Sequence, residues 1–110
     1  MPTPAETDWS RIASLYDLLR LAQPSPVIEL NRAVAVAMAE GPERGLELLD
    51  HADLADGLSD YQWFWSSRGD LLRRAGRPEE AATDYRRALE LATNPVERRF
   101  LEGRLADLGS

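Results

Sequence analysis

Residues 61–91, YQWFWSSRGDLLRRAGRPEEAATDYRRALEL, predict two amphipathic helices joined by a tight turn. Apolar and small residues recur in each half at three- and four-residue steps, which indicates one buried face per helix. Gly76-Arg77-Pro78 lies between the halves. A glycine tolerates unusual backbone angles, and a proline suits the first turn of a helix, so these residues predict the turn.

The spacing of particular residues on these two helices follows the tetratricopeptide pattern. That pattern is a Trp-x2-Leu-Gly-x2-Tyr helix followed by an Ala-x3-Phe helix. Trp65 opens it, Gly69 takes the small position, and Ala81 and Tyr85 fall at the expected spacing, whereas Arg68 replaces the usual Leu. Because one such hairpin cannot bury both of its faces, further helix pairs are expected to stack on it.

Cap residues and prolines divide the rest of the chain into further helices. The spacing of 36 residues between Gly45 and Ala81 is close to the roughly 34-residue period of the repeat, so we pair the second helix with the third and the fourth with the fifth. The fold predicted is an all-α, tetratricopeptide-like right-handed stack of about six helices. It forms a single domain at residues 7–108 after a flexible lead-in at residues 1–6. The first helix is expected to follow a cap at Thr7 or Asp8 and to end at residues 22–24. Further helices are expected at 26–39 after a cap at Ser25, at 42–52, and from 95 onward after a cap at Asn94, with a loose connection at 53–58 and a cap at Ser59. The first helix has an apolar face (Trp9, Ile12, Ala13, Leu15, Tyr16, Leu19), and the last has a buried stripe (Val96, Phe100, Leu101, Leu105, Leu108).

Composition narrows the classes of function. The formal net charge of -6 argues against binding a nucleic-acid backbone, which needs clustered positive charge. The absence of cysteine excludes disulfides and thiolate metal sites, and it suits the cytoplasm. No apolar run reaches the ~20 residues that span a bilayer, and the first residues lack the pattern of a secretory signal. We therefore expect a cytoplasmic protein without a cofactor, a membrane or a small-molecule substrate.

Several strings go beyond a generic repeat. They are DWxxIAxLYD at 8–17, PSPVIxLNRAVAVA at 24–37, LLRRxGR at 71–77, YRRAL at 85–89 and NxxERxFL at 94–101. Together they resemble the C-terminal region of bacterial RNA polymerase sigma factors of the extracytoplasmic-function type that carry a tetratricopeptide-like extension. The resemblance covers roughly residues 7–108. The aromatic run at 62–67 and the acidic balance depart from it.

The resemblance implies a regulatory or scaffolding extension of a transcription initiation factor. Promoter-reading sigma domains would lie N-terminal to it. The partners implied are those sigma domains or core RNA polymerase, and this region would not itself bind promoter DNA. An independent helical-repeat adaptor that binds a peptide or a partner helix is the alternative. A small hydrolase or metal enzyme is a third hypothesis, which we disfavour because no nucleophile motif or phosphate loop is present.

The candidate binding residues lie on the first helices of the pairs, which line the concave surface of tetratricopeptide stacks. Trp63, Ser66, Asp70 and Arg73 recur at steps of three, four and three residues, opposite the predicted core face. Trp and Arg are common interface anchors. Trp63 could instead pack on a neighbouring helix or loop, since Trp is usually largely buried. Asn31, inside an apolar helix, could bind a partner or make an interhelical hydrogen bond, and we favour the second.

Two further clusters have simpler explanations. The arginines at 73, 74 and 77 could meet an acidic segment or a phosphate, but they also lie at a predicted helix C-terminus, where cations are favourable. Asp50-His51-x-Asp53 resembles a metal or acid–base group only superficially, because it contains the single histidine of the chain. A solvated helix end is the favoured interpretation, and we predict no catalytic or metal-binding residues.

Overall fold

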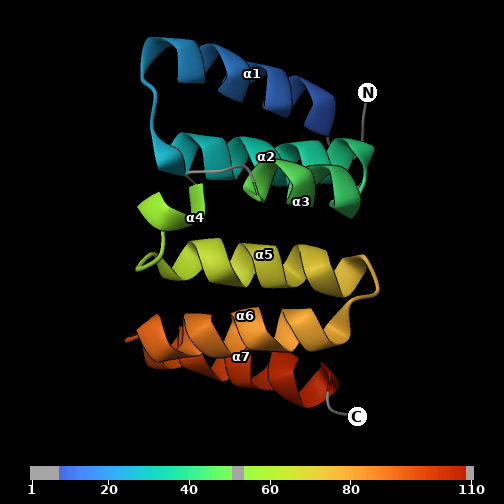
Figure 1. Cartoon of the computed structure of the whole chain (residues 1–110), viewed down its shortest axis with the longest axis vertical. Helices are drawn as coiled ribbons and strands as arrows, with labels where there is room; N and C mark the ends of the chain where they lie inside the picture. Colours follow the sequence, from blue (N-terminus) through green and yellow to red (C-terminus); the bar gives the residue numbers. More distant parts are fainter. Residues whose placement is uncertain (1–7, 51–53, 109–110) are drawn as a thin grey trace.

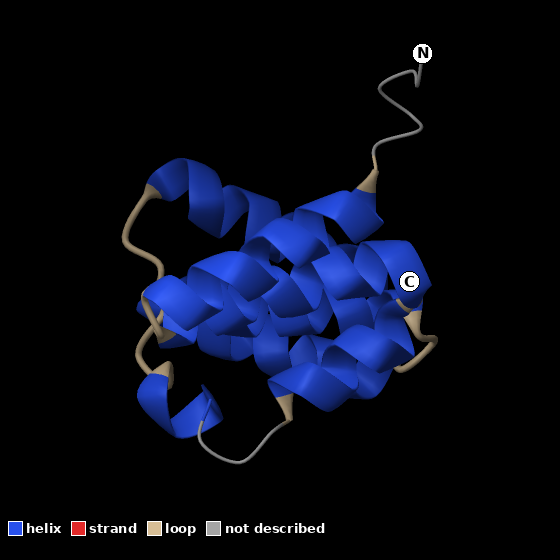
Figure 2. Ribbon diagram, turned by 90° about the horizontal axis from the view of Figure 1, so that it is seen from above, coloured by secondary structure: helices blue, strands red, loops and turns tan. Residues whose placement is uncertain are grey.

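The computed structural model describes residues 8–50 and 54–108, and these form seven helices that build one stack along the longest axis of the molecule (Figure 1). The all-α prediction is confirmed, and Figure 2 shows only helices and their connections in the described ranges. One helix was missed, because the predicted loose connection contains a short helical turn. The lead-in at 1–6 lies outside the described residues. The helices are α1 (Trp9–Ala22), α2 (Pro26–Glu40), α3 (Pro42–Leu49), α4 (Leu54–Gly57), α5 (Gln62–Arg74), α6 (Pro78–Leu91) and α7 (Pro95–Leu108).

Side-chain caps begin three of these helices where the sequence predicts them. The Asp8 side chain accepts a hydrogen bond from the backbone of Arg11 at 3.0 Å, Ser25 caps α2 by accepting from Val27, and Asn94 caps α7. The predicted cap at Ser59 is wrong. The helix begins later, at Gln62, and the Ser59 carbonyl instead accepts a hydrogen bond from the Trp65 indole N–H at 2.9 Å. The predicted end of the third helix at Ala52 falls outside the described residues, and α3 ends at Leu49.

The helices pair as the repeat spacing predicts. α2 packs on α3 and α5 packs on α6, while α3 contacts α5 and so joins the two pairs. α1 packs on α2 at one end of the stack, and α7 packs on α6 at the other (Figure 1). α5 is therefore the central helix, with α3 on one side and its pair partner α6 on the other.

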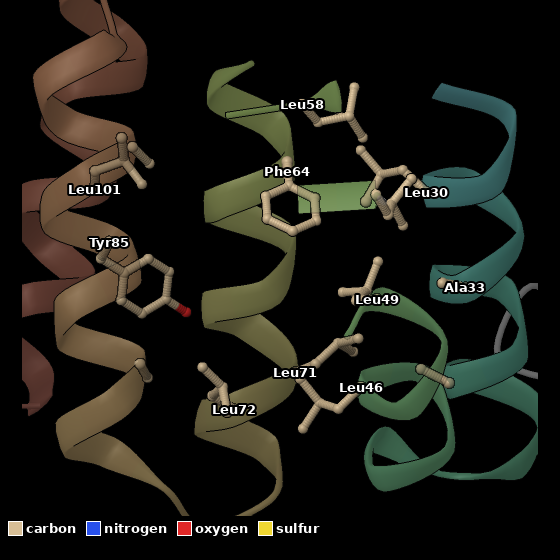
Figure 3. Packing of buried hydrophobic residues seen from close by; sticks show 14 of the residues in the cluster. Leu30, Ala33, Leu46, Leu49, Leu58, Phe64, Leu71, Leu72, Tyr85 and Leu101 are labelled. Atoms are coloured by element: carbon tan, nitrogen blue, oxygen red, sulfur yellow. The ribbon is translucent and has the colours of Figure 1, made fainter. Parts of the chain in front are cut away.

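Buried side chains form one continuous core along this stack (Figure 3). Phe64 and Leu72 of α5 are almost completely buried, and so is Tyr85 of α6. Two glycines permit the close helix contacts. Added Cβ atoms would lie 3.0 Å from the Tyr85 ring at Gly69, and 2.5 Å from the Ala37 Cβ at Gly45. The helices thus lie so close together at Gly45 and Gly69 that a larger side chain would crowd the neighbouring helix, as the sequence predicts.

The two end helices are more exposed than their patterns predict. No residue of α1 is fully buried, and Leu15 and Leu19 of its predicted apolar face are 52% and 47% exposed. On α7, Leu101 is buried as expected, whereas Val96 and Phe100 are 72% and 50% exposed. An end helix contacts a neighbour on one side only, so part of its apolar surface faces solvent. Within the described residues, no helix is long and apolar enough to cross a membrane.

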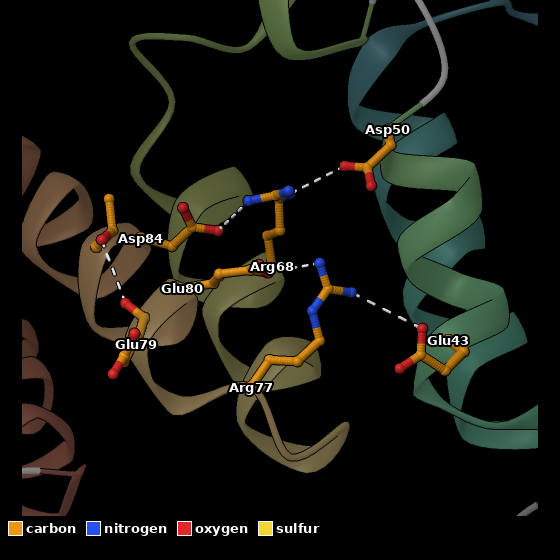
Figure 4. A network of polar contacts seen from close by, with 8 residues as sticks. Glu43, Asp50, Arg68, Arg77, Glu79, Glu80 and Asp84 are labelled. Carbon is orange, nitrogen blue, oxygen red and sulfur yellow. Dashed lines mark hydrogen bonds and ion pairs between the residues drawn. The ribbon is translucent and has the colours of Figure 1, made fainter.

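Arg68, the residue that departs from the repeat pattern, links α3, α5 and α6 (Figure 4). Its guanidinium contacts Asp84 at 2.7 Å and Asp50 at 3.1 Å. Burial raises the pKa of the Asp84 carboxyl, although Arg68 opposes the shift. Arg77 forms a similar bridge between Glu80 at 2.5 Å and Glu43 at 3.8 Å. Arg68 thus forms one ion pair within the α5–α6 pair, to Asp84, and one towards α3, to Asp50.

Replacing Arg68 tests how much these ion pairs stabilise the fold. We expect Arg68→Met to lower the free energy of unfolding by about 1–2 kcal/mol, because the buried Asp84 carboxylate would lose its guanidinium partner. Asp50→Ala is the matched control. It removes only the contact to an exposed carboxylate and should cost less than about 0.5 kcal/mol. Urea unfolding measures both free energies. Equal losses in the two variants would show that the buried contact to Asp84 stabilises the fold no more than the exposed contact to Asp50.

Candidate functional site

An open apolar pocket of about 320 Å³ lies between α5 and α7. The buried side chain of Leu101 belongs to its lining, together with the half-exposed rings of Trp63 and Phe100. Large apolar side chains left this exposed on one face commonly mark an interaction site. The complete lining is Gln62, Trp63, Ser66, Val96, Glu97, Phe100 and Leu101.

Two of the predicted binding residues line this pocket. Trp63 is 48% exposed, so its ring remains accessible although it lies against α7. Ser66 is buried, and its hydroxyl donates a long hydrogen bond of 3.4 Å to the Trp63 carbonyl. Ser66 therefore lines the pocket as a small side chain whose hydroxyl is already hydrogen-bonded within α5.

Asp70 and Arg73, one and two turns further along α5, form a polar cluster with Tyr85 and Arg104. The Tyr85 hydroxyl donates to Asp70, and the Arg73 Nε donates to the Tyr85 hydroxyl at 3.4 Å. The Asp70 carboxylate also lies 3.9 Å from Arg73 and 3.8 Å from Arg104. Asp70 thus holds a tyrosine of α6 and an arginine of α7 beside α5, in line with the apolar pocket.

The Tyr85 phenol is a sensitive reporter of this cluster. Burial, reinforced by the hydrogen bond to Asp70, raises the pKa of Tyr85 to about 12. The chain has no lysine and no cysteine, so few other groups titrate between pH 9 and 11. The protonation state of Tyr85 can therefore be followed through stability at alkaline pH.

We expect the stability contributed by the Tyr85 proton to be complete below about pH 10 and to be lost as pH rises towards 12. The unfolded chain releases the proton near the ordinary pKa of about 10, whereas the folded chain retains it. The free energy of unfolding should therefore fall by up to about 1.4 kcal/mol per pH unit in this window. Tyr85→Phe should remove that part of the slope. Urea unfolding at about pH 9, 10 and 11 measures it, and identical slopes would contradict the account.

Asn31 lies apart from these residues. It is exposed on α2 and does not line the pocket between α5 and α7. The structure thus brings together four of the five predicted site residues and leaves the fifth elsewhere on the surface. A role for Asn31 in partner binding stays a prediction.

The sequence interpretation missed the contribution of α7 to the site. Val96, Glu97 and Phe100 line the pocket, and Arg104 joins the polar cluster. A signal for them was present, because a shift of 34 residues, close to the repeat period, relates Ser66 to Phe100 and Asp70 to Arg104. Extending the repeat to α7 would have placed these residues on the same face.

A second, larger cavity of about 640 Å³ is bounded by α1, α2, α3 and α4. Its two arginines, Arg20 and Arg32, already contact carboxylates, with the Arg32 Nε 2.7 Å from Asp17. Because these two arginines already have carboxylate partners, they have less to gain from binding a charged ligand. We therefore regard the α5–α7 pocket as the stronger candidate for a binding site. Among the residues that the structure describes, no three His, Cys, Asp or Glu side chains are grouped to hold a metal. His51 falls outside those residues.

Comparison with known proteins identifies the repeat directly. A family model described as tetratricopeptide repeat matches residues 63–95, which run from α5 to the start of α7. A protein of Rhizobium meliloti (strain 1021), described as uncharacterized, is 44% identical over 107 residues. The match covers 97% of this chain and 25% of that protein, so the chain spans about a quarter of the relative's length. No solved structure matches the chain. The detected repeat is of a kind that typically serves protein–protein interaction.

Proposed function

We propose that this chain is a non-catalytic protein-interaction domain that takes a segment of its partner into the groove between α5 and α7. The observation that carries the proposal is the open apolar pocket with the half-exposed Trp63 in its wall. Trp is among the residues most enriched at interface hot spots, and a partner that covered it would bury a large apolar surface.

The position of the pocket supports this function. The first helix of each pair lines the concave side of tetratricopeptide stacks, and we propose that the face of α5 with Trp63, Ser66, Asp70 and Arg73 does so here. The core contacts of α5, such as Phe64 and Leu72, lie on other faces and are fully buried. The helix can therefore bind a partner without giving up its core packing. The contact between Asp70 and Arg104 at 3.8 Å joins α7 to α5 beside the groove.

In its parent protein, we propose that the domain is the regulatory extension of an extracytoplasmic-function sigma factor, and that it acts in the cytoplasm. Its partners would be the sigma domains of the same protein or core RNA polymerase. Support comes from the strings described above and from the relative, in which the matched segment is a quarter of a longer protein. The net charge of -6 favours protein contacts over direct contact with promoter DNA.

A stand-alone adaptor that binds peptides or partner helices is the second candidate. The apolar lining of the pocket favours the adaptor as much as the sigma-factor extension, because an apolar pocket can bind an apolar side chain of many different partners. The reading frame upstream of residue 1 in the parent gene separates the two. Sigma domains encoded there are the expected result, and their absence would leave only the adaptor.

The binding claim itself is tested by isothermal titration calorimetry. The chain is titrated with the sigma domains of the parent gene and, separately, with core polymerase. Saturable binding to at least one of them is expected. If neither the sigma domains nor core polymerase gives a heat of binding, and an unrelated peptide does bind, the result would favour the adaptor function over the sigma-factor function. A stoichiometric metal in the purified chain would revive the enzyme hypothesis.

A further inference from the structure

We propose that the segment bound in the α5–α7 pocket carries one large apolar side chain next to a cationic side chain. This inference rests on the proposed function and specifies the chemistry of the partner. It is carried by the lining of the pocket and by the way in which the neighbouring charges are already paired.

The pocket selects an apolar anchor. Most of its wall comes from Trp63, Val96, Phe100 and Leu101, and the remaining space is about 320 Å³. The Ser66 hydroxyl is already engaged with a backbone carbonyl. A polar side chain inserted here would lose its water without gaining a partner, whereas an apolar one would gain contacts on several sides.

Glu97 is the one charged residue among the described residues that line the pocket, and it gives the rim a negative charge. Its carboxylate accepts a hydrogen bond from the Gln62 amide at 2.8 Å. An ionised carboxylate can accept several hydrogen bonds, so this contact leaves capacity for a cation. The net charge of -6 would also attract a basic segment over longer distances.

The two arginines beside the pocket do not provide a matching site for an acidic partner. Asp70 lies within 4 Å of both Arg73 and Arg104, and Asp107 further attracts Arg73. The Arg104 guanidinium also stacks over the Phe100 ring at 4.9 Å. An incoming carboxylate would meet two aspartates as well as two arginines, so the polar end of the groove is close to neutral. The unbalanced charge is that of Glu97.

A set of defined peptides tests the proposal. Each is a fluorescent, blocked nine-residue peptide with a central Trp, Phe or Leu, flanked by Lys, Gln or Glu. Fluorescence anisotropy against the whole chain should give tightest binding for Lys, roughly tenfold weaker binding for Gln, and weaker still for Glu. The advantage of Lys should shrink as salt is raised.

Variants of the chain identify the side chains that cause the preference for the Lys peptides and those that bind the apolar anchor. Glu97→Gln should remove most of the difference between the Lys and Gln peptides, and Glu97→Lys should reverse the order of Lys and Glu. Trp63→Ala should weaken all peptides at least tenfold. Leu21→Ala, which changes a 77% exposed leucine on α1, should change none of them.

The outcomes separate this inference from the proposed function. Equal or tighter binding of the Glu peptides to the unaltered chain, still dependent on Trp63, would overturn the cationic preference and leave the groove as the binding site. Binding that Trp63→Ala does not weaken would place the peptides elsewhere and overturn the inference. Absence of binding by every peptide would overturn it as well, while the titrations with sigma domains and polymerase would still decide the proposed function.

Discussion

Gly45→Val is expected to lower the free energy of unfolding by on the order of 3 kcal/mol, a large share of the stability of a domain of this size. A Cβ at this position would lie 2.5 Å from the Ala37 Cβ and 2.9 Å from the Ala33 carbonyl oxygen. Both contacts belong to α2, and one of them is to the backbone, so rotation of a side chain cannot relieve the clash. α3 would have to move away from α2, which would also disturb its contact with α5.

Gly103→Ala is the matched control for this prediction. Gly103 also lies within a helix, but no atom is found within 4 Å of the position that its Cβ would take. Alanine should therefore stabilise α7 by up to about 1 kcal/mol through its higher helix propensity. Urea or thermal unfolding measures both variants. Similar effects of the same sign at the two glycines would mean that the close approach of α2 and α3 is not what requires Gly45.

Trp63→Ala is expected to weaken binding to the natural partner by about 30-fold or more, equivalent to about 2 kcal/mol. Half of the Trp63 surface is exposed in the free chain, so the variant should remain folded, with a circular dichroism spectrum like that of the parent. The reason for the loss is that the indole forms one wall of the pocket and is half-exposed there.

Leu18→Ala on α1 is the control for the partner experiment, because Leu18 is also large and exposed but lies outside the pocket. Calorimetry with the sigma domains or core polymerase measures both affinities. A partner that loses affinity with Leu18→Ala but not with Trp63→Ala would contradict the groove and identify α1 as the binding surface.

The central part of the fold was predictable because its residues follow a strict spacing. Trp65, Gly69, Ala81 and Tyr85 each occupy a position that close helix packing requires, so the pattern specifies the α5–α6 hairpin. The second pair, α2 and α3, followed from its prolines and from the repeat period. Start signals at Thr7 or Asp8, at Ser25 and at Asn94 were also readable, because a side-chain cap is a local interaction.

The errors have physical causes in tertiary contacts. Ser59 has the side chain of a cap, but Trp65 binds its carbonyl and the helix begins at Gln62 instead. Val96 and Phe100 follow an apolar helical period, yet Val96 is largely exposed and Phe100 half-exposed because α7 has a neighbour on one side only. Periodicity shows which residues share a face, and it does not show whether that face is covered.

The candidate site was predictable in part for the same reason. The spacing predicted that Trp63, Ser66, Asp70 and Arg73 share one face of α5 opposite the core. Trp63 is half-exposed as that position requires, whereas the prediction is wrong for Ser66, which is buried. Their partners on α7 required knowledge of which helix lies across the groove. Asn31, selected as a polar residue in an apolar helix, lies at a distance from the pocket because that argument contains no spatial information.

The most direct test of the account is an NMR titration of the ¹⁵N-labelled chain with the sigma domains of the parent gene and then with core polymerase. The account predicts that chemical-shift changes cluster on α5 and α7 around Trp63, Glu97 and Phe100, and that Trp63→Ala abolishes them. Changes concentrated on α1, or changes that persist unaltered in Trp63→Ala, would contradict the claim that the α5–α7 groove binds the partner.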